Sequence, residues 1–133
     1  MTDARRGNAT STVMSADECA SRIESVDVGR IAWVQDGAPH VLPVNYALDN
    51  GAIIFRTASD SSMAAQLPGS AVAFEVDSVD FGNLTGWSVV ITGTCRPAPD
   101  DLAGRMTPWA DGDRSSVFRI EAGATTGRRL EQH

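Results

Sequence analysis

The sequence contains no lysine, so all eleven of its lysine-or-arginine positions are arginines. A lysine Schiff base, a lysine general base and the phosphate-binding lysine of a P-loop are therefore excluded. Any anion that the protein binds must be held by arginine, hydroxyl or backbone N–H groups.

Histidine and cysteine are also scarce, with two of each in the chain. Cys19 and Cys95 lie far apart and have no metal-type spacing, so we expect both to be reduced and buried. The histidines are His40 and the terminal His133, too few to complete a zinc site or to offer several choices of catalytic base. We therefore expect no metal site.

Basic charge and long apolar runs are lacking as well. Seventeen acidic residues give a net charge of −6 and a pI near 4.7, which argues against nucleic acid as a partner. The longest uncharged apolar runs, such as residues 87–93, are too short to cross a membrane, and no secretory signal opens the chain. We expect a soluble, cytoplasmic protein that binds neither nucleic acid nor membrane.

The chain length of 133 residues, with 42% hydrophobic residues, is typical of one globular domain. Residues 1–13 are small, polar and unpatterned, which predicts a disordered N-terminal arm before a domain over residues 14–130. Ser15 to Glu18 form a capping-box pattern, which predicts a helix that continues to Ser25.

The rest of the chain is dominated by short runs with strand character. The pattern predicts strands at residues 28–35, 40–48, 52–58, 70–78, 86–96 and 115–121, and a short helix capped by Ser59 or Asp60 that ends at Gln66. Short turns join the first three strands, so they must form an antiparallel meander. Pro43 predicts an edge or a bulge in the second strand. The fold class is mainly β, a six-stranded antiparallel barrel with a few short helices.

One cluster of residues has the composition of an anion site. Arg56 stands in an otherwise apolar strand, and Thr57 is followed by the hydroxyls of Ser59, Ser61 and Ser62 at a helix start. Arginine, hydroxyls and helix N–H groups together suit a phosphate. A surface arginine beside an ordinary serine cap explains the same pattern, and is somewhat favoured by the pattern alone.

Other candidates have equally plain structural explanations. Glu75 and Asp77 share a strand face and suit acid–base chemistry, but a solvated face is the better explanation in an acidic protein. Trp33, Trp87 and Trp109 can stack on an aromatic ligand, although packing in a core or an interface is the default for each.

Six motifs in order carry a stronger signal than any of them alone: residues 29–32 (GRIA), 43–46 (PVNY), 54–57 (IFRT), 73–77 (AFEVD), 86–93 (GWSVVITG) and 126–129 (TGRR). Their order and spacing resemble the pyridoxamine 5′-phosphate oxidase-like family of flavin-binding split barrels, in its small actinobacterial-type branch near the nitroimidazole-reductase-like proteins. The resemblance covers residues 15–130.

This resemblance implies a homodimeric split barrel that holds flavin mononucleotide (FMN) in two clefts at the dimer interface. Some relatives use a deazaflavin coenzyme and a few bind haem. The implied function is that of a flavin-dependent oxidoreductase, with hydride transfer between the flavin and a small-molecule substrate; no protein acid or base stands out as catalytic. The cofactor-binding residues that the resemblance implies are Leu42, Pro43, Val44, Asn45 and Tyr46 along the ring, Arg56, Thr57, Ser61, Ser62 and Met63 at the phosphate, and Glu75, Trp87, Ser88 and Arg128 closing the cleft, in part from the other subunit.

One departure from the family pattern concerns the phosphate. The family usually has a Gly-Ser/Thr-Lys/Arg-Leu sequence after the arginine-threonine pair, whereas this chain has Asp60-Ser61-Ser62-Met63. Ser62 replaces the basic residue, and the loss of one charged hydrogen bond weakens binding about tenfold or more. Arg56 compensates, or the cofactor differs, or the site is lost. The alternative function is therefore that of a non-catalytic or degenerate flavin-, deazaflavin- or haem-binding protein.

Overall fold

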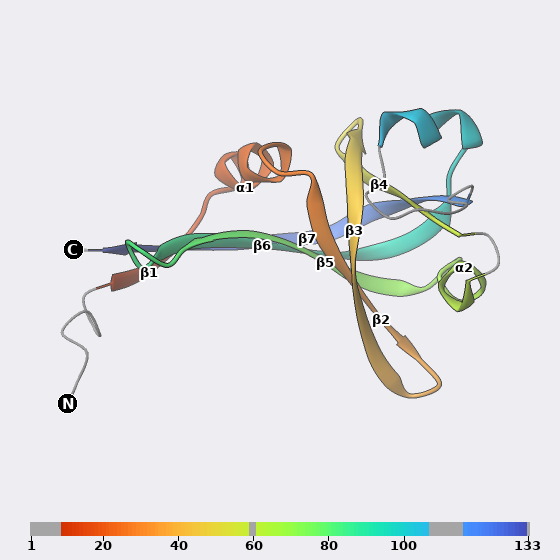
Figure 1. The fold of residues 1–133 in the computed structure, drawn as a ribbon, viewed down its shortest axis with the longest axis horizontal. Helices are drawn as coiled ribbons and strands as arrows, with labels where there is room; N and C mark the ends of the chain where they lie inside the picture. Colours follow the sequence, from red (N-terminus) through yellow and green to blue (C-terminus); the bar gives the residue numbers. More distant parts are fainter. Residues whose placement is uncertain (1–8, 59–60, 107–115, 133) are drawn as a thin grey trace.

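The computed structural model describes residues 9–58, 61–106 and 116–132 (Figure 1). In chain order the elements are β1 (Ala9–Val13), α1 (Ala16–Glu24), β2 (Val28–Gln35), β3 (Ala38–Asp49), β4 (Ala52–Thr57), α2 (Ser62–Gln66), β5 (Ala71–Asp80), β6 (Thr85–Pro97), the 3-10 helix η1 (Asp100–Arg105) and β7 (Ser116–Gln132).

The strands form one antiparallel sheet that closes on itself. Their order is β1-β7-β4-β3-β2-β5-β6, and β6 pairs again with β7. Six strands thus make a barrel, while β1 extends the sheet beyond it. The meander from β2 to β4 and the mainly β, split-barrel fold class are confirmed.

A register shift between Thr92 and Gly93 adjusts the long β6–β7 ladder. A Cβ atom on Gly93 would lie only 2.0 Å from the carbonyl oxygen of Glu121, so the irregularity requires glycine. The tight turn expected before the third strand is also confirmed, since Asn50 and Gly51 have φ values of 49° and 84°.

The expectation of a disordered arm over residues 1–13 is wrong for residues 9–13, and residues 1–8 lie outside the described part. Residues 9–13 form β1, which pairs with β7 from Ala9 opposite Gln132 to Val13 opposite Arg128. The last strand is also longer than the predicted 115–121, because β7 continues to Gln132. The two errors have one cause, since the extended end of β7 offers an edge that residues 9–13 cover.

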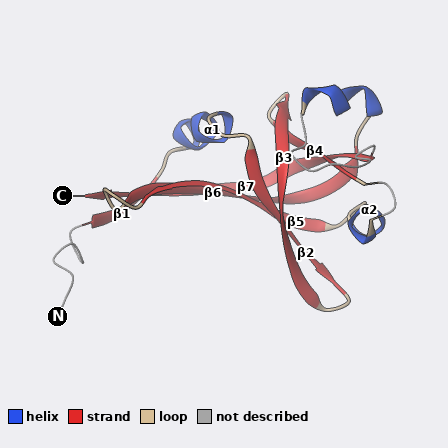
Figure 2. Ribbon diagram, in the orientation of Figure 1, coloured by secondary structure: helices blue, strands red, loops and turns tan. Residues whose placement is uncertain are grey.

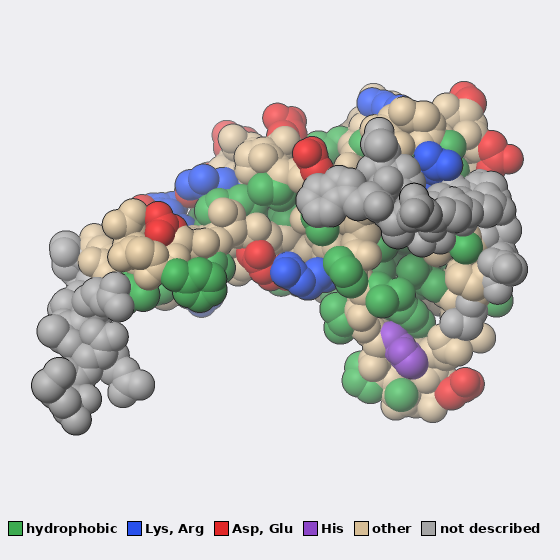
Figure 3. Space-filling view, in the orientation of Figure 1, with side chains coloured by type: hydrophobic (Ala, Val, Ile, Leu, Met, Phe, Trp, Pro, Cys, Tyr) green, Lys and Arg blue, Asp and Glu red, His purple; other side chains and the backbone are tan. Residues whose placement is uncertain are grey.

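Three strands project from the barrel as an arm. In Figures 1 and 2, β5, β6 and β7 run toward the end where β1 lies, with α1 on one face, while the β2–β3 hairpin projects elsewhere. Exposed apolar side chains occur on both projections (Figure 3). They are Val13, Val79, Phe81 and Leu130 on the arm, and Val34, Val41 and Leu42 on the hairpin.

Helix α1 is fastened to the sheet by polar contacts at both ends. The Ser15 hydroxyl accepts a hydrogen bond from the Glu18 N–H at 3.2 Å, as the cap predicts. The Glu18 carboxylate forms an ion pair with Arg129 of β7. At the other end the Tyr46 hydroxyl donates to the Ile23 carbonyl oxygen.

Tyr46 belongs to the core. Its side chain is 6% exposed and packs edge-on against Phe74, with ring centroids 5.1 Å apart. Burial, and then the charge of Asp27, raise the pKa of Tyr46 to about 12, so its hydroxyl remains a donor at neutral pH. The two cysteines are likewise buried and unpaired, as expected.

The outward face of the sheet carries a cluster of three charges. Arg30 of β2 lies directly opposite Glu75 of β5 and donates to Glu75 and Asp77, each at 3.1 Å. Loss of hydration, and then the neighbouring Asp77 carboxyl, raise the pKa of Glu75 to about 7, although Arg30 opposes the shift. Folded protein therefore binds this proton more tightly than unfolded protein does.

The Tyr46→Phe substitution tests the anchor of α1. It leaves the Ile23 carbonyl without its hydroxyl donor, so we expect the free energy of unfolding to fall by about 1–2 kcal/mol in urea denaturation. Ser25→Ala is the matched control, because it removes an exposed hydroxyl that donates to the Arg22 carbonyl at the same helix end. Equal losses in the two variants would contradict a buried anchor.

The Glu75→Gln substitution tests the raised pKa of Glu75. Because the folded pKa lies above the ordinary value of 4.5, ionisation of Glu75 lowers the stability of the wild type as pH rises from about 4.5 to 7. We expect urea denaturation at pH 5 to 8 to show a stability difference that shifts steadily in favour of the variant. Glu24→Gln, which removes an exposed carboxylate elsewhere, is the control. A difference independent of pH would contradict the raised pKa.

Candidate functional site

A cavity of about 330 Å³ opens where strand β3 separates from β4. It contains most of the site residues expected from the sequence. Its described lining consists of Leu42, Pro43, Val44, Asn45, Arg56, Thr57, Ala58, Ser61, Met63 and Met106.

The separation follows from the pairing of β3. This strand pairs with β2 over residues 38–45, but with β4 only from Tyr46 onward. The Tyr46 N–H donates to the Asp27 carbonyl of the chain before β2 at 3.0 Å. In an antiparallel ladder the backbone N–H and C=O groups of successive residues point to alternate sides of the strand, so the backbone nitrogen of residue 43 points away from β2. Pro43 therefore interrupts no bond to β2, and the expected edge is confirmed at this point.

Hydroxyl groups line the end of the cavity beside α2. The Thr57 and Ser61 oxygens lie 3.4 Å apart, and Thr57 is only 7% exposed. The Ser61 hydroxyl donates to the Ala58 carbonyl at 2.8 Å and accepts from the Ala64 N–H at 3.0 Å. Ser61 is thus the helix cap. The predicted caps, Ser59 and Asp60, lie outside the described residues, as does the Ser62 side chain.

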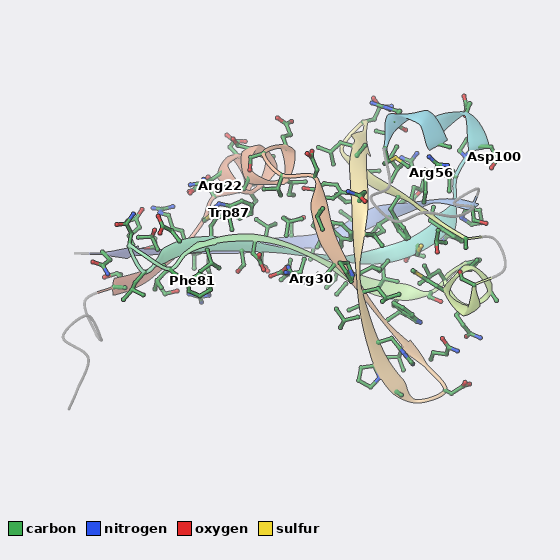
Figure 4. All side chains as sticks on the ribbon, in the orientation of Figure 1. Arg22, Arg30, Arg56, Phe81, Trp87 and Asp100 are labelled. Carbon is green, nitrogen blue, oxygen red and sulfur yellow. The ribbon has the colours of Figure 1, made fainter. Side chains whose placement is uncertain are left out.

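Arg56 is the one charged side chain among the described lining residues. It is partly buried and donates to the Ala103 carbonyl of η1 at 3.3 Å (Figure 4). The cavity therefore has a cationic, hydroxyl-rich end and an apolar wall formed by residues 42–44 and two methionines. This combination suits a planar molecule that carries a phosphate.

The four residues expected to close the cleft do not line this cavity within one chain. Ser88 lies opposite both Asp77 and Arg128 in the sheet register, so it shares the outward face with Glu75. Arg128 donates to the Ser11 hydroxyl at 3.3 Å.

Trp87 occupies the opposite face of the arm. The Arg22 guanidinium lies over its ring, 5.4 Å from the centroid (Figure 4). Trp87 and Arg22 also line a separate cavity of about 560 Å³ near the end of β7. Of the other tryptophans, Trp33 is buried and Trp109 lies outside the described residues.

Sequence reasoning missed the contribution of η1. The segment after β6 is rich in proline, glycine and acidic residues and predicts only a turn of helix and a loop. Nevertheless, Ala103 binds Arg56 and Met106 lines the cavity. Neither residue has a periodic or chemical signal that would have identified it.

The described residues contain no group of three or more histidine, cysteine, aspartate or glutamate side chains placed to hold a metal ion. Among the same residues, no helix has the length and apolar character needed to span a membrane.

Solved structures of similar fold are known. The FAD-binding protein from Mycobacterium smegmatis is 29% identical, with a TM-score of 0.73 over 90% of this chain and 98% of that one. An FAD-binding protein from Mesorhizobium loti is 26% identical, with a TM-score of 0.70 over 90% of this chain and 97% of that one.

Sequence comparison agrees with the fold. The uncharacterized protein Rv0080 of Mycobacterium tuberculosis is 32% identical over 127 residues, which span 88% of this chain and 84% of that protein. The family model described as pyridoxamine 5′-phosphate oxidase matches residues 15–129, nearly the whole of the barrel. With its closed six-stranded sheet and the cavity at the split, this chain belongs to the pyridoxamine 5′-phosphate oxidase family.

Proposed function

We propose that this protein is a cytoplasmic, homodimeric flavin-dependent oxidoreductase that binds FMN in the cavity between β3, β4 and α2. The observation that carries the proposal is the union of Arg56, Thr57 and Ser61 at one end with the apolar wall of residues 42–44 at the other. The two similar proteins described as FAD-binding support a flavin as the ligand.

When bound, the flavin supplies the hydride transfer with a small-molecule substrate. The residues of the chain provide binding and orientation. Arg56 and Thr57 hold the phosphate, and the backbone of residues 42–45 lies along the ring. Ser61 can donate to the phosphate only by giving up its bond to the Ala58 carbonyl, so Arg56 is the main anion contact.

A second candidate function is a flavin or deazaflavin carrier without turnover. The observation that favours it is Ser62, which occupies the position where the usual family sequence has lysine or arginine. A bound flavin that dithionite reduces, but that neither a nicotinamide nor a reduced deazaflavin donor reduces, would identify the carrier. Flavin reduction by either donor would support the oxidoreductase.

The Arg56→Met substitution tests the cofactor site. FMN, FAD, a deazaflavin coenzyme and riboflavin are titrated into the purified protein, with flavin fluorescence and thermal shift as readouts. A charged hydrogen bond contributes about 1.5–3 kcal/mol, so we expect FMN binding to weaken about 10- to 150-fold while riboflavin binding changes little.

Arg96→Met is the control for this experiment, because Arg96 is an exposed arginine of β6 outside the cavity. Wild-type protein that binds none of these compounds would refute the proposed function. Equal losses of affinity for FMN and for riboflavin would instead show that Arg56 does not bind the phosphate.

The homodimer is supported by two features of the chain. The cavity of about 330 Å³ is at the small end of the usual range for ligand pockets, which suits a site enlarged by a second subunit. The arm exposes Phe81 (80%), Val79 (58%) and Leu130 (41%), which suit burial against a second copy. We propose that the arm of each subunit closes the cavity of the other.

The Phe81→Asp substitution tests this dimer. Phe81 is too exposed to support the fold of one chain, so we expect the variant to remain folded but to elute as a monomer in chromatography with light scattering. Its flavin affinity should fall as well. Phe81→Leu, which keeps the contact apolar, is the control. A dimeric Phe81→Asp protein, or a monomeric wild type, would contradict the proposed interface.

A further inference from the structure

Asp49 joins three parts of the chain outside the cavity. It lies at the end of β3, and its carboxylate accepts hydrogen bonds from Arg105 of η1 at 2.8 Å and from Arg119 of β7 at 3.2 Å. The Asp49 and Arg119 side chains are 21% and 28% exposed, so their ion pair is partly shielded from water, whereas Arg105 is 47% exposed and its pair with Asp49 is open on one side. Partial burial makes such pairs stronger than those at an open surface.

Among the described residues, the 3-10 helix packs only at the edge of the barrel. None of its residues is buried. Leu102 and Ala103 pack at the rim of a small apolar cluster formed by Ile54, Met106 and Val117. The hydrogen bond from the Met106 N–H to the Ala103 carbonyl is long, at 3.5 Å. The ion pair between Arg105 and Asp49 is thus one of the described ties between η1 and the barrel.

The position of η1 matters because it reaches the cavity. Its Ala103 carbonyl accepts the hydrogen bond from Arg56, and Met106, the next residue after η1, lines the cavity wall. A carbonyl acceptor fixes one edge of a guanidinium group, which leaves its other N–H groups directed elsewhere. The place of η1 therefore contributes to the orientation of Arg56.

We propose that Asp49 is a positioning residue for Arg56: by holding η1 against the barrel, it fixes the guanidinium that selects phosphorylated flavins over unphosphorylated ones. The selectivity part of this inference rests on the proposed function, whereas the positioning part does not. A purely structural Asp49 would affect stability and would not alter the preference for a phosphate.

The test uses Asp49→Asn and Arg105→Met in the full chain. Asparagine retains the shape of Asp49 but removes its charge, and Arg105→Met releases η1 while Asp49 keeps Arg119. The matched control is Glu131→Gln, which removes a carboxylate that pairs with Arg129 at 2.7 Å near the far end of β7. Each variant is measured for its dissociation constants with FMN and with riboflavin.

A second readout follows Arg56 without any ligand. In protein that is isotope-labelled only at its eleven arginines, the side-chain nitrogen NMR signals come from arginine alone. The signal that is missing in the Arg56→Met variant identifies Arg56. We expect its guanidinium signal to shift and its rotation to become faster in Asp49→Asn and Arg105→Met, but not in Glu131→Gln.

For the ligands, we expect the preference for FMN over riboflavin to fall about 3- to 30-fold in both variants, the usual size of a coupling of this kind. We expect little further loss when Asp49→Asn is added to Arg56→Met. An unchanged Arg56 signal, equal losses for both flavins, or additive losses in the double variant would each overturn the proposal. If wild type binds neither flavin, the proposed function fails, and the Arg56 signal alone decides the positioning role.

Discussion

The structure depends on the point at which β3 leaves β4. Up to residue 45 strand β3 is paired with β2, and from Tyr46 onward it is paired with β4. A strand that paired with both neighbours along its whole length would leave no split between β3 and β4, and hence no cavity. Pro43 lies at the unpaired stretch, where its missing N–H interrupts no bond to β2. The cavity is therefore a consequence of backbone pairing, and side chains then determine what it binds.

The cavity offers little positive charge to the phosphate that we propose it binds. Its described lining has a single cation, Arg56, in a chain with a net charge of −6 and no lysine. When one guanidinium carries most of the attraction, its orientation has a large effect on affinity, since arginine binds a phosphate through a fixed fork of N–H groups. This dependence on orientation is the physical reason for the role that we propose for the distant contact between Asp49 and Arg105.

Much of the barrel could be predicted from the sequence, because alternation of apolar residues and the Asn50-Gly51 turn are local signals. The grouping of Arg56, Thr57 and Ser61 at one end of the cavity was also predictable, since these residues are neighbours in the chain. What could not be predicted depends on distant pairing. Residues 9–13 look like a polar tail until β7 offers them an edge, and Tyr46 lies in a predicted binding strand while its side chain is buried in the core.

The pairing of β1 with β7 has a geometric consequence. Ala9 lies opposite Gln132, so the two ends of the described chain leave the sheet side by side. The turn between β5 and β6, which carries Phe81, is at the same end of the arm (Figure 4). The points at which the chain enters the described sheet at Ala9 and leaves it at Gln132 therefore share the end of the arm that carries Phe81.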